Sequence, residues 1–292
     1  MMEGKTSKKQ FMIYIIFAFV SSWIVQAIGS YFAIKGNAVI FKMIMAGCMF
    51  MPLLAVLAAR IPLKGMGWIP HLKEKIRWVF FAMWIPALIS LVGAVLYFII
   101  FPGHFDREFT TMKLTMGEAA VKQLEAQGMT VEMTIIISSI AALTYGPFLN
   151  MIVALGEEVG WRGAMYPYLK ERFGKTSGRI IGGIIWSIWH WPVMILAGYE
   201  YGTDYIGAPF LGLVAFGMFC VLFGILEDIV YEKTDTIWGA ALFHGAINGW
   251  SVYAYLLKPE YMNRMIFGPA SIGLISMIPM AGLVLVLLRK EK

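Results

Sequence analysis

The chain has 292 residues, of which 59% are hydrophobic and only 14% are charged. Soluble domains carry about 25% charged residues, so this composition excludes an ordinary soluble globule, a disordered chain and a nucleic-acid binder with a basic surface. The formal charge of +6 is expected to reflect membrane topology. Cys48 and Cys220 both lie in apolar runs, which indicates buried thiols rather than a disulfide framework or a cysteine-based zinc site.

The apolar runs predict an all-α, polytopic integral membrane helix bundle that forms a single membrane domain over residues 1–292. A spanning helix needs about 20 mostly apolar residues. About eight runs meet this requirement and predict spans at 11–34, 38–59, 78–101, 134–155, 180–198, 209–230, 237–257 and 266–288.

The loop charges predict the orientation of these spans. Alternating eight spans from a cytoplasmic N-terminus places most Lys and Arg residues on the cytoplasmic side. We therefore expect a multi-pass plasma-membrane protein with both termini in the cytoplasm. No A-x-A-like cleavage site closes the first apolar run, so this run is expected to remain as the first span.

Two stretches depart from this simple pattern. The longest hydrophilic stretch, 102–133, is predicted to lie outside, with a short amphipathic helix over 117–127. Pro147 interrupts the fourth apolar run, so a helix over 148–169 is an alternative fourth span.

Ionisable residues inside membrane spans are costly, and they are functional candidates by default. The candidates that cluster in three apolar motifs, with one amide among them, are Glu157, Glu158, Arg162, His190, His244 and Asn248. At 1.5 Å per residue, Glu157, His190 and His244 lie about 20, 16 and 13 Å from the cytoplasmic ends of their helices. Three helices are thus expected to bring one carboxylate and two imidazoles to similar depths. The other histidines, His71 and His104, lie in loops and are expected at the surface.

The two adjacent glutamates of the first motif are expected to have different roles. Residues four apart share a helix face, so Arg162 is expected to neutralise Glu158 inside the membrane. Glu157 is rotated by about 100° and is free for another task. A purely structural ion pair between Glu158 and Arg162 is the alternative.

The two histidine motifs have the same spacing. Trp186 shares a face with His190, so the indole is expected to pack against the imidazole. His244 and Asn248 also share a face and are expected to point at one spot. Each of these residues alone could serve only in helix packing or structural hydrogen bonding. Their common depth in the membrane favours one shared functional site.

Small residues accompany each motif and allow close approach of helices in lipid. The pairs at four-residue spacing are Gly156 with Gly160, Gly178 with Gly182, and Gly245 with Gly249.

These motifs together resemble a known family. Glu157-Glu158-x-x-x-Arg162, Trp186-x-x-x-His190 and His244-x-x-x-Asn248 are similar to the three-part signature of the CPBP family. Its members are the CAAX proteases and bacteriocin-processing enzymes, also called Abi proteins. The motifs span about a third of the chain, and the catalytic core is expected at about 134–257. The second motif of the family usually begins with Phe, where this chain has Trp186.

The resemblance implies an eight-helix intramembrane endopeptidase whose site opens toward the cytoplasm. Its substrate would be a membrane-associated protein or peptide, of CAAX type or related to bacteriocins. In the family, the first Glu and the second-motif His activate the hydrolytic water, which corresponds to Glu157 and His190. The third motif stabilises the oxyanion, which corresponds to His244 and Asn248. The expected partners are membrane lipid and the substrate, without nucleic acid.

A metal is the main open question about the mechanism. The family has carried a metalloprotease label, and Glu157, His190 and His244 could bind one Zn²⁺ with an open water position. No His-Glu-x-x-His motif is present, but ligands can come from separate helices. We favour the metal-free use of Glu157 and His190 and keep zinc as the alternative.

Two other functions compete with proteolysis. A non-enzymatic bacteriocin immunity protein could keep the same scaffold and bind a peptide without cutting it. A transporter could use the buried Glu–His cluster as a proton or metal relay. The lack of a recognisable internal repeat counts against the transporter.

Overall fold

The computed structural model describes residues 6–70, 72–249 and 252–291, and the regular secondary structure of this part of the chain is mainly helical. An isolated bridge pairs Phe105 with Leu257. The predicted all-α membrane bundle is confirmed. The α-helices are α1 (Lys8–Ile34), α2 (Ala38–Cys48), α3 (Met51–Ala58), α4 (Leu72–Ile100), α5 (Thr110–Met116), α6 (Glu118–Ala126), α7 (Val131–Leu143), α8 (Gly146–Gly160), α9 (Tyr166–Phe173), α10 (Lys175–Ala197), α11 (Phe210–Thr234), α12 (Ile237–Asn248) and α13 (Ile278–Lys290). Short 3-10 helices are η1 (Pro102–His104), η3 (Val252–Leu256) and η4 (Pro259–Arg264), and a π-helical turn, η2 (Trp161–Met165), joins α8 to α9.

Five segments of the described chain are long and apolar enough to cross a membrane. They are Lys8–Ile34, Ala38–Ala58, Lys73–Ile100, Lys175–Ala197 and Phe210–Thr234. Helices α6 and α7 meet at 87° and would supply a sixth if they are counted as one broken span. The number of candidate spans is therefore smaller than the eight that the apolar runs predicted.

Three predicted runs are not single spanning helices. The run 134–155 is divided between α7 and α8, because α7 ends at Leu143 and Pro147 occupies the first turn of α8. From Gly146 the chain continues through η2 and α9, which matches the alternative helix predicted over 148–169.

The last two predicted spans are also shorter than expected. Helices α12 and α13 have 12 and 13 residues, whereas a crossing needs about 20. Gly249 follows α12 directly, and residues 250–251 of the predicted run 237–257 lie outside the described chain. Pro269 lies in the irregular first half of the run 266–288 and offers no amide N–H to continue a helix.

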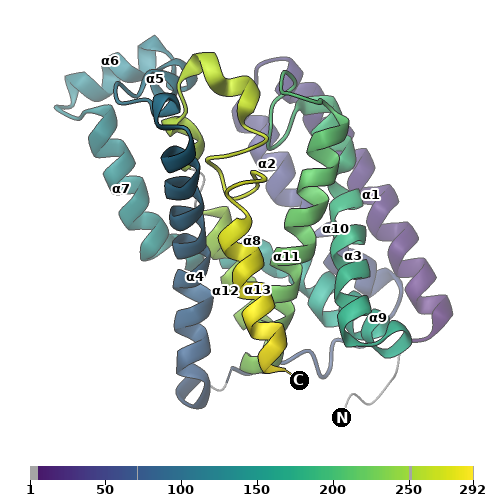
Figure 1. The fold of residues 1–292 in the computed structure, drawn as a ribbon. Helices are drawn as coiled ribbons and strands as arrows, with labels where there is room; N and C mark the ends of the chain where they lie inside the picture. The colour runs from purple at the N-terminus through teal and green to yellow at the C-terminus, as the bar shows by residue number, and fades with distance from the viewer. Residues whose placement is uncertain (1–5, 71, 250–251, 292) are drawn as a thin grey trace.

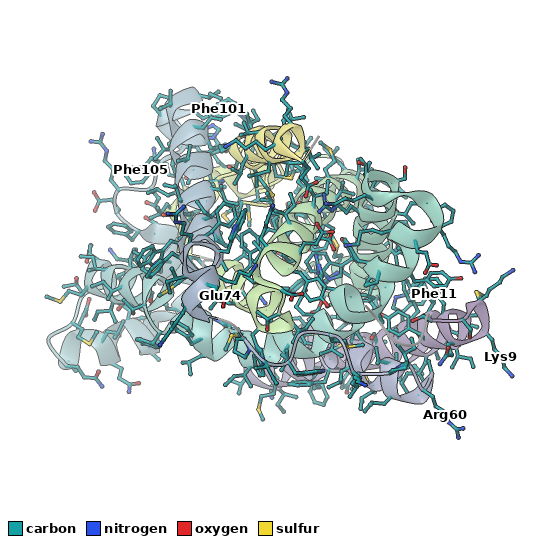
Figure 2. All side chains as sticks on the ribbon, turned by 90° about the horizontal axis from the view of Figure 1, so that it is seen from below. Lys9, Phe11, Arg60, Glu74, Phe101 and Phe105 are labelled. Atoms are coloured by element: carbon teal, nitrogen blue, oxygen red, sulfur yellow. The ribbon has the colours of Figure 1, made fainter. Side chains whose placement is uncertain are left out.

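Helices α8, α10, α11 and α12 form the centre of the bundle (Figure 1). Helix α12 packs mainly on α8, and α10 packs mainly on α11. Helix α1 lies against α10, whereas α4 covers α12 and α11. The beginning of α1 and the end of α13 lie at the same end of the bundle (Figure 1). Viewed from that end, Lys9 and Arg60 project from its rim (Figure 2).

The opposite end carries α5 and α6, which belong to the hydrophilic stretch (Figure 1). The amphipathic helix predicted over 117–127 is present as α6. Cys48 and Cys220 are both free and buried, as their apolar surroundings predicted.

The histidine expected at the surface of this end is instead buried. His104 lies between the rings of Phe101 and Tyr261, at centroid distances of 4.8 and 3.9 Å, and its Nδ1 is 2.8 Å from the hydroxyl of Tyr97. Burial lowers the pKa of His104 below its ordinary value. The surface expectation for His104 is therefore wrong, while His71 lies outside the described residues.

The predicted small-residue motifs lie at backbone contacts between helices. A Cβ atom added at Gly156 would lie 2.6 Å from the carbonyl oxygen of Met49, and one at Gly245 would lie 2.5 Å from the amide nitrogen of Met151. Gly178 meets the backbone of α9 in the same way. Gly245 thus lets α12 approach α8 closely, whereas Gly156 lets α8 approach the junction of α2 and α3.

Gly245→Ala is expected to destabilise the protein by about 1–3 kcal/mol, because the added methyl group would push α12 away from α8. Gly282→Ala is the matched control, since a Cβ at this exposed site in α13 meets nothing within 4 Å. Thermal unfolding of both variants in one detergent tests this. Equal unfolding temperatures would contradict the close contact.

Candidate active site

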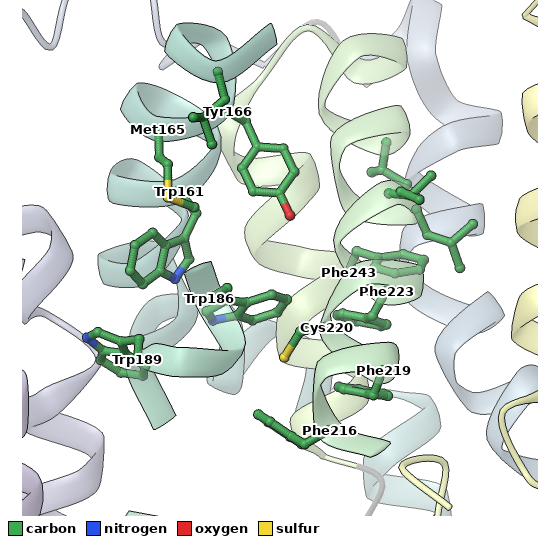
Figure 3. Close-up of a cluster of buried hydrophobic side chains, with 14 of the residues drawn as sticks. Trp161, Met165, Tyr166, Trp186, Trp189, Phe216, Phe219, Cys220, Phe223 and Phe243 are labelled. Carbon is green, nitrogen blue, oxygen red and sulfur yellow. The ribbon is translucent and has the colours of Figure 1, made fainter. Parts of the chain in front are cut away.

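Two indole groups fix one oxygen of Glu157. Trp161 Nε1 and Trp186 Nε1 donate hydrogen bonds to Glu157 Oε2 over 2.9 and 2.8 Å. Trp161 belongs to η2 and Trp186 to α10, and their rings converge in Figure 3. Glu157 is 2% exposed, and both of these hydrogen bonds end on Oε2. The carboxylate is thus oriented through one oxygen, which leaves the other for a further partner.

Arg162 lies at the centre of a buried charge cluster. Its Nη1 donates to Glu158 Oε1 over 3.0 Å, and its Nη2 donates to Glu227 Oε2. The rings of Tyr166 and Trp186 lie on the guanidinium, each with its centroid 4.7 Å from Cζ. The predicted pair of Glu158 and Arg162 is therefore confirmed, with Glu227 as a second counter-ion. Arg162 lies in the π-helical turn, a local geometry that is frequent at functional sites.

His244 faces the same carboxylates. Its Nδ1 is 2.8 Å from Glu158 Oε1 and 3.6 Å from an oxygen of Glu227. A carboxylate can only accept a hydrogen bond, so Nδ1 is the nitrogen that carries a proton here. The ring also meets the indole of Trp186 edge-on, with centroids 5.3 Å apart. This arrangement leaves Nε2 of His244 for another partner.

His190 is held by its own helix and by aromatic rings. Its Nδ1 donates to the backbone carbonyl of Trp186 over 3.0 Å, which leaves the lone pair on Nε2. The imidazole packs against Trp189 and Phe216 at 4.6 and 5.0 Å, and its centroid lies 6.1 Å from that of Trp186. The predicted contact between Trp186 and His190 is thus present. In addition, Trp186 contacts the site by hydrogen bonding, which a Phe in its place could not do.

Asn248 is not joined to the charge cluster. It is the last residue of α12, one turn beyond His244, and its side chain is exposed. It makes no side-chain hydrogen bond to another described residue. A role for Asn248 at the oxyanion stays a prediction from the resemblance.

Glu227 is the residue that the motifs did not reveal. It is fully buried on α11 and lies beside Asp228, which bonds Lys170 and Arg179 at the edge of the bundle over 2.7 and 2.6 Å. The signal was present in the sequence, because both acidic residues lie inside the predicted span 209–230. The rule that singled out Glu157 applies equally to them.

The metal-ligating atoms are not grouped as the zinc alternative required. Among the described residues, Glu158, Glu227 and His244 each offer a ligand atom within 4.8 Å of one another. Glu157 and His190 do not belong to that group. The two carboxylates already bind the buried guanidinium, so a divalent cation between them would face a positive charge. This donor set does not fit the predicted zinc site.

Comparison with known proteins gives the same assignment as the motifs. Residues 139–250 match the family model described as Rce1-like, type II CAAX prenyl endopeptidase. A CAAX prenyl protease 2 from Methanococcus maripaludis is 30% identical over 111 residues. Residues 139–250 are thus similar to the CAAX proteases.

The matched part is limited to the centre of the bundle. The similarity to the Methanococcus maripaludis protein covers 35% of this chain and 37% of that relative, so the chain matches little more than a third of the relative's length. The matched residues run from α7 to just beyond α12. They include every motif residue and Glu227, whereas α1 to α6 and α13 lie outside this range.

Arg162→Ala is expected to destabilise the protein by about 3–5 kcal/mol and to reduce activity, because Glu158 and Glu227 would stay buried without their shared counter-charge. Arg172→Ala removes an exposed guanidinium that lies over the ring of Tyr168 and should cost less than about 1 kcal/mol. Chemical unfolding of both variants in the same detergent measures the difference. Similar losses in the two variants would show that the buried cluster does not depend on Arg162.

Proposed function

We propose that the protein is an intramembrane endopeptidase that hydrolyses a peptide bond of a membrane-associated protein or peptide. The observation that carries the proposal is the Glu157 carboxylate, which two indole N–H groups hold by one oxygen deep inside a CPBP-family core. The relative from Methanococcus maripaludis is named a CAAX prenyl protease, which supports a CAAX-type substrate. A bacteriocin-related peptide is the second substrate class.

The proposed mechanism uses Glu157 and His190 to activate water. A proton leaves the water for Glu157 Oε1 or His190 Nε2, and the hydroxide adds to the carbonyl carbon of the substrate. The tetrahedral intermediate then expels the amine, which takes up the transferred proton as the carbon–nitrogen bond breaks. Because Glu157 Oε2 already accepts two hydrogen bonds, Oε1 is the oxygen suited to act as the base.

Stabilisation of the oxyanion is assigned to His244 and Asn248. With its Nδ1 proton bonded to Glu158, His244 donates through Nε2 as an imidazolium, a form that the neighbouring carboxylates favour. Preorganised donors of this kind stabilise the charge that develops in the transition state. Asn248 would join His244 when substrate is bound, since its amide is exposed at the end of the same helix.

The proposed reaction is metal-free. The grouping of Glu158 and Glu227 around a guanidinium supports this choice, because the positive charge that zinc would bring is already supplied by Arg162. Zinc held by Glu157, His190 and His244 stays as the alternative and is tested below.

The proposed location is the plasma membrane, with both termini and the mouth of the site on the cytoplasmic side. This orientation is supported by Lys9 and Arg60, which project from the end of the bundle that also holds the end of α13. The last turn of α13 adds Arg289 and Lys290 to the same end.

Glu157→Ala is expected to abolish cleavage, with a loss of at least about 100-fold, because the water would lose its base. Mass spectrometry of peptide termini in membranes with matched amounts of wild type or variant measures this directly. Glu125→Ala, an exposed carboxylate on α6, should give the wild-type termini. Termini that do not differ between wild type and Glu157→Ala would favour the immunity or transport functions.

Treatment with a strong chelator is expected to leave cleavage by the purified protein unchanged, and elemental analysis should find no stoichiometric zinc. The physical reason is that the base and the positive charge both come from the chain itself. Loss of activity in chelator, restored by added Zn²⁺, would establish the metal-dependent alternative instead.

A further inference from the structure

The N-terminal helix α1 contacts the centre of the site although it lies outside the family match. Its buried residues at intervals of four form one face, which turns toward the centre of the bundle. This face consists of Tyr14, Ala18, Ser22, Gln26 and Ser30. At one position the face meets η2, where the ring of Tyr14 lies edge-on to Trp161 with centroids 6.3 Å apart. Trp161 is one of the two donors to Glu157, so α1 supports that half of the site.

The other half of the site is contacted by Gln26. Its Nε2 donates to the carbonyl oxygen of Trp189 over 2.8 Å, and its Oε1 accepts from the amide N–H of Val193 over 3.2 Å. A regular α-helix pairs these same two backbone groups with each other, because they are four residues apart. The side-chain amide of Gln26 therefore bridges one turn of α10, and His190 lies inside that turn.

Pro192 explains why this turn needs a partner from another helix. Proline has no N–H, and its ring crowds the carbonyl one turn earlier, which weakens the helix at this point. The carbonyl that Pro192 leaves without a helical partner belongs to Ile188, and Gln26 bonds the adjacent pair, Trp189 and Val193, in the turn that the proline ring loosens. Gln26 supplies both an acceptor and a donor, which a hydroxyl or an apolar side chain could not do in this geometry.

Burying the polar amide of Gln26 is unfavourable, which indicates that its hydrogen bonds to α10 have a specific role. Gln26 is completely buried, and a buried polar group is unfavourable unless it is hydrogen-bonded. An apolar residue would be enough for packing α1 against α10. Ser22 and Ser30, one turn away on either side, have hydroxyls without a partner among the described residues. Among these three polar residues, Gln26 alone bonds α10.

We propose that Gln26 is a positioning residue, which holds the turn of α10 that carries His190 so that the imidazole stays in register with Glu157. The peptide carbonyl that Gln26 binds belongs to Trp189 and directly precedes His190, so its position governs the direction of the imidazole. The inference rests on the proposed function, since it assigns His190 a part in activating water.

Gln26→Leu tests this role. The variant is expected to lose about 10- to 100-fold in kcat, because small misplacements of a catalytic group have effects of this size. KM should stay within about threefold, since Gln26 does not face the substrate. Ser30→Ala is the matched control: it removes a buried polar group from the same face of α1, one turn away, and should keep the wild-type kcat. An equal loss in both variants, or none in Gln26→Leu, would overturn the proposal.

A second substitution distinguishes positioning from general support of the fold. Pro192→Ala restores the N–H that pairs with the carbonyl of Ile188 and removes the ring that loosens this turn, so the turn should hold without a partner from α1. In this background, Gln26→Leu should cost less than about threefold in kcat. A loss as large as that in the parent background would overturn the proposal. If Gln26→Leu cannot be purified, Gln26→Met, which has a similar length, takes its place under the same criteria.

Nitrogen NMR provides a measurement that does not depend on cleavage. The chain has four histidines, so ¹⁵N-histidine labelling in nanodiscs gives few signals, and His190→Asn identifies the one from His190. Gln26→Leu should shift this signal, whereas Ser30→Ala should not. A shift in Gln26→Leu together with an inactive wild type would support the positioning role and contradict the proposed protease. An unshifted signal together with an undiminished kcat would overturn the positioning role.

Discussion

The structure depends on how three carboxylates are accommodated away from water. Burying an ionised group costs several kcal/mol unless charges and hydrogen bonds offset the lost hydration. Glu158 and Glu227 share one guanidinium, while two indole N–H groups bond Glu157. Glu157 and Glu158 come from α8 and Glu227 comes from α11, and Arg162 in η2 bonds carboxylates from both helices. The rings of Tyr166 and Trp186 lie on this guanidinium and hold it between them.

Because buried carboxylates need partners, the two acidic residues of the first motif, Glu157 and Glu158, have different partners and different roles. Arg162 and His244 both bond Oε1 of Glu158, which therefore acts on the site through their positions. Glu157, one position earlier, has neutral donors on one oxygen alone. Neutral donors orient this carboxylate through one oxygen without adding a counter-charge. Trp186 links the two sets, because it bonds Glu157 and also lies on the guanidinium.

The sequence predicted best what depends on local spacing. Arg162 meets Glu158, and His190 packs near Trp186, because residues four apart on a helix are neighbours wherever the helix goes. Glu227 lies 65 residues from the arginine that it binds, and no spacing rule connects them. The sequence predicted which regions are helical better than it predicted where each helix begins and ends. Hydropathy averages over about 20 residues, so the short α12 and α13 and the irregular chain around them resembled full spans.

Helix α1 places part of the site under the influence of the bilayer. Only 28% of its most apolar window is buried inside the protein, and the large apolar side chains on its outer side face the surroundings. Its inner side holds the turn around His190 through Gln26. Lipid thickness and lateral pressure act on the tilt of such a helix. A change in the thickness of the hydrocarbon layer around α1 therefore acts, through Gln26, on the turn that carries His190.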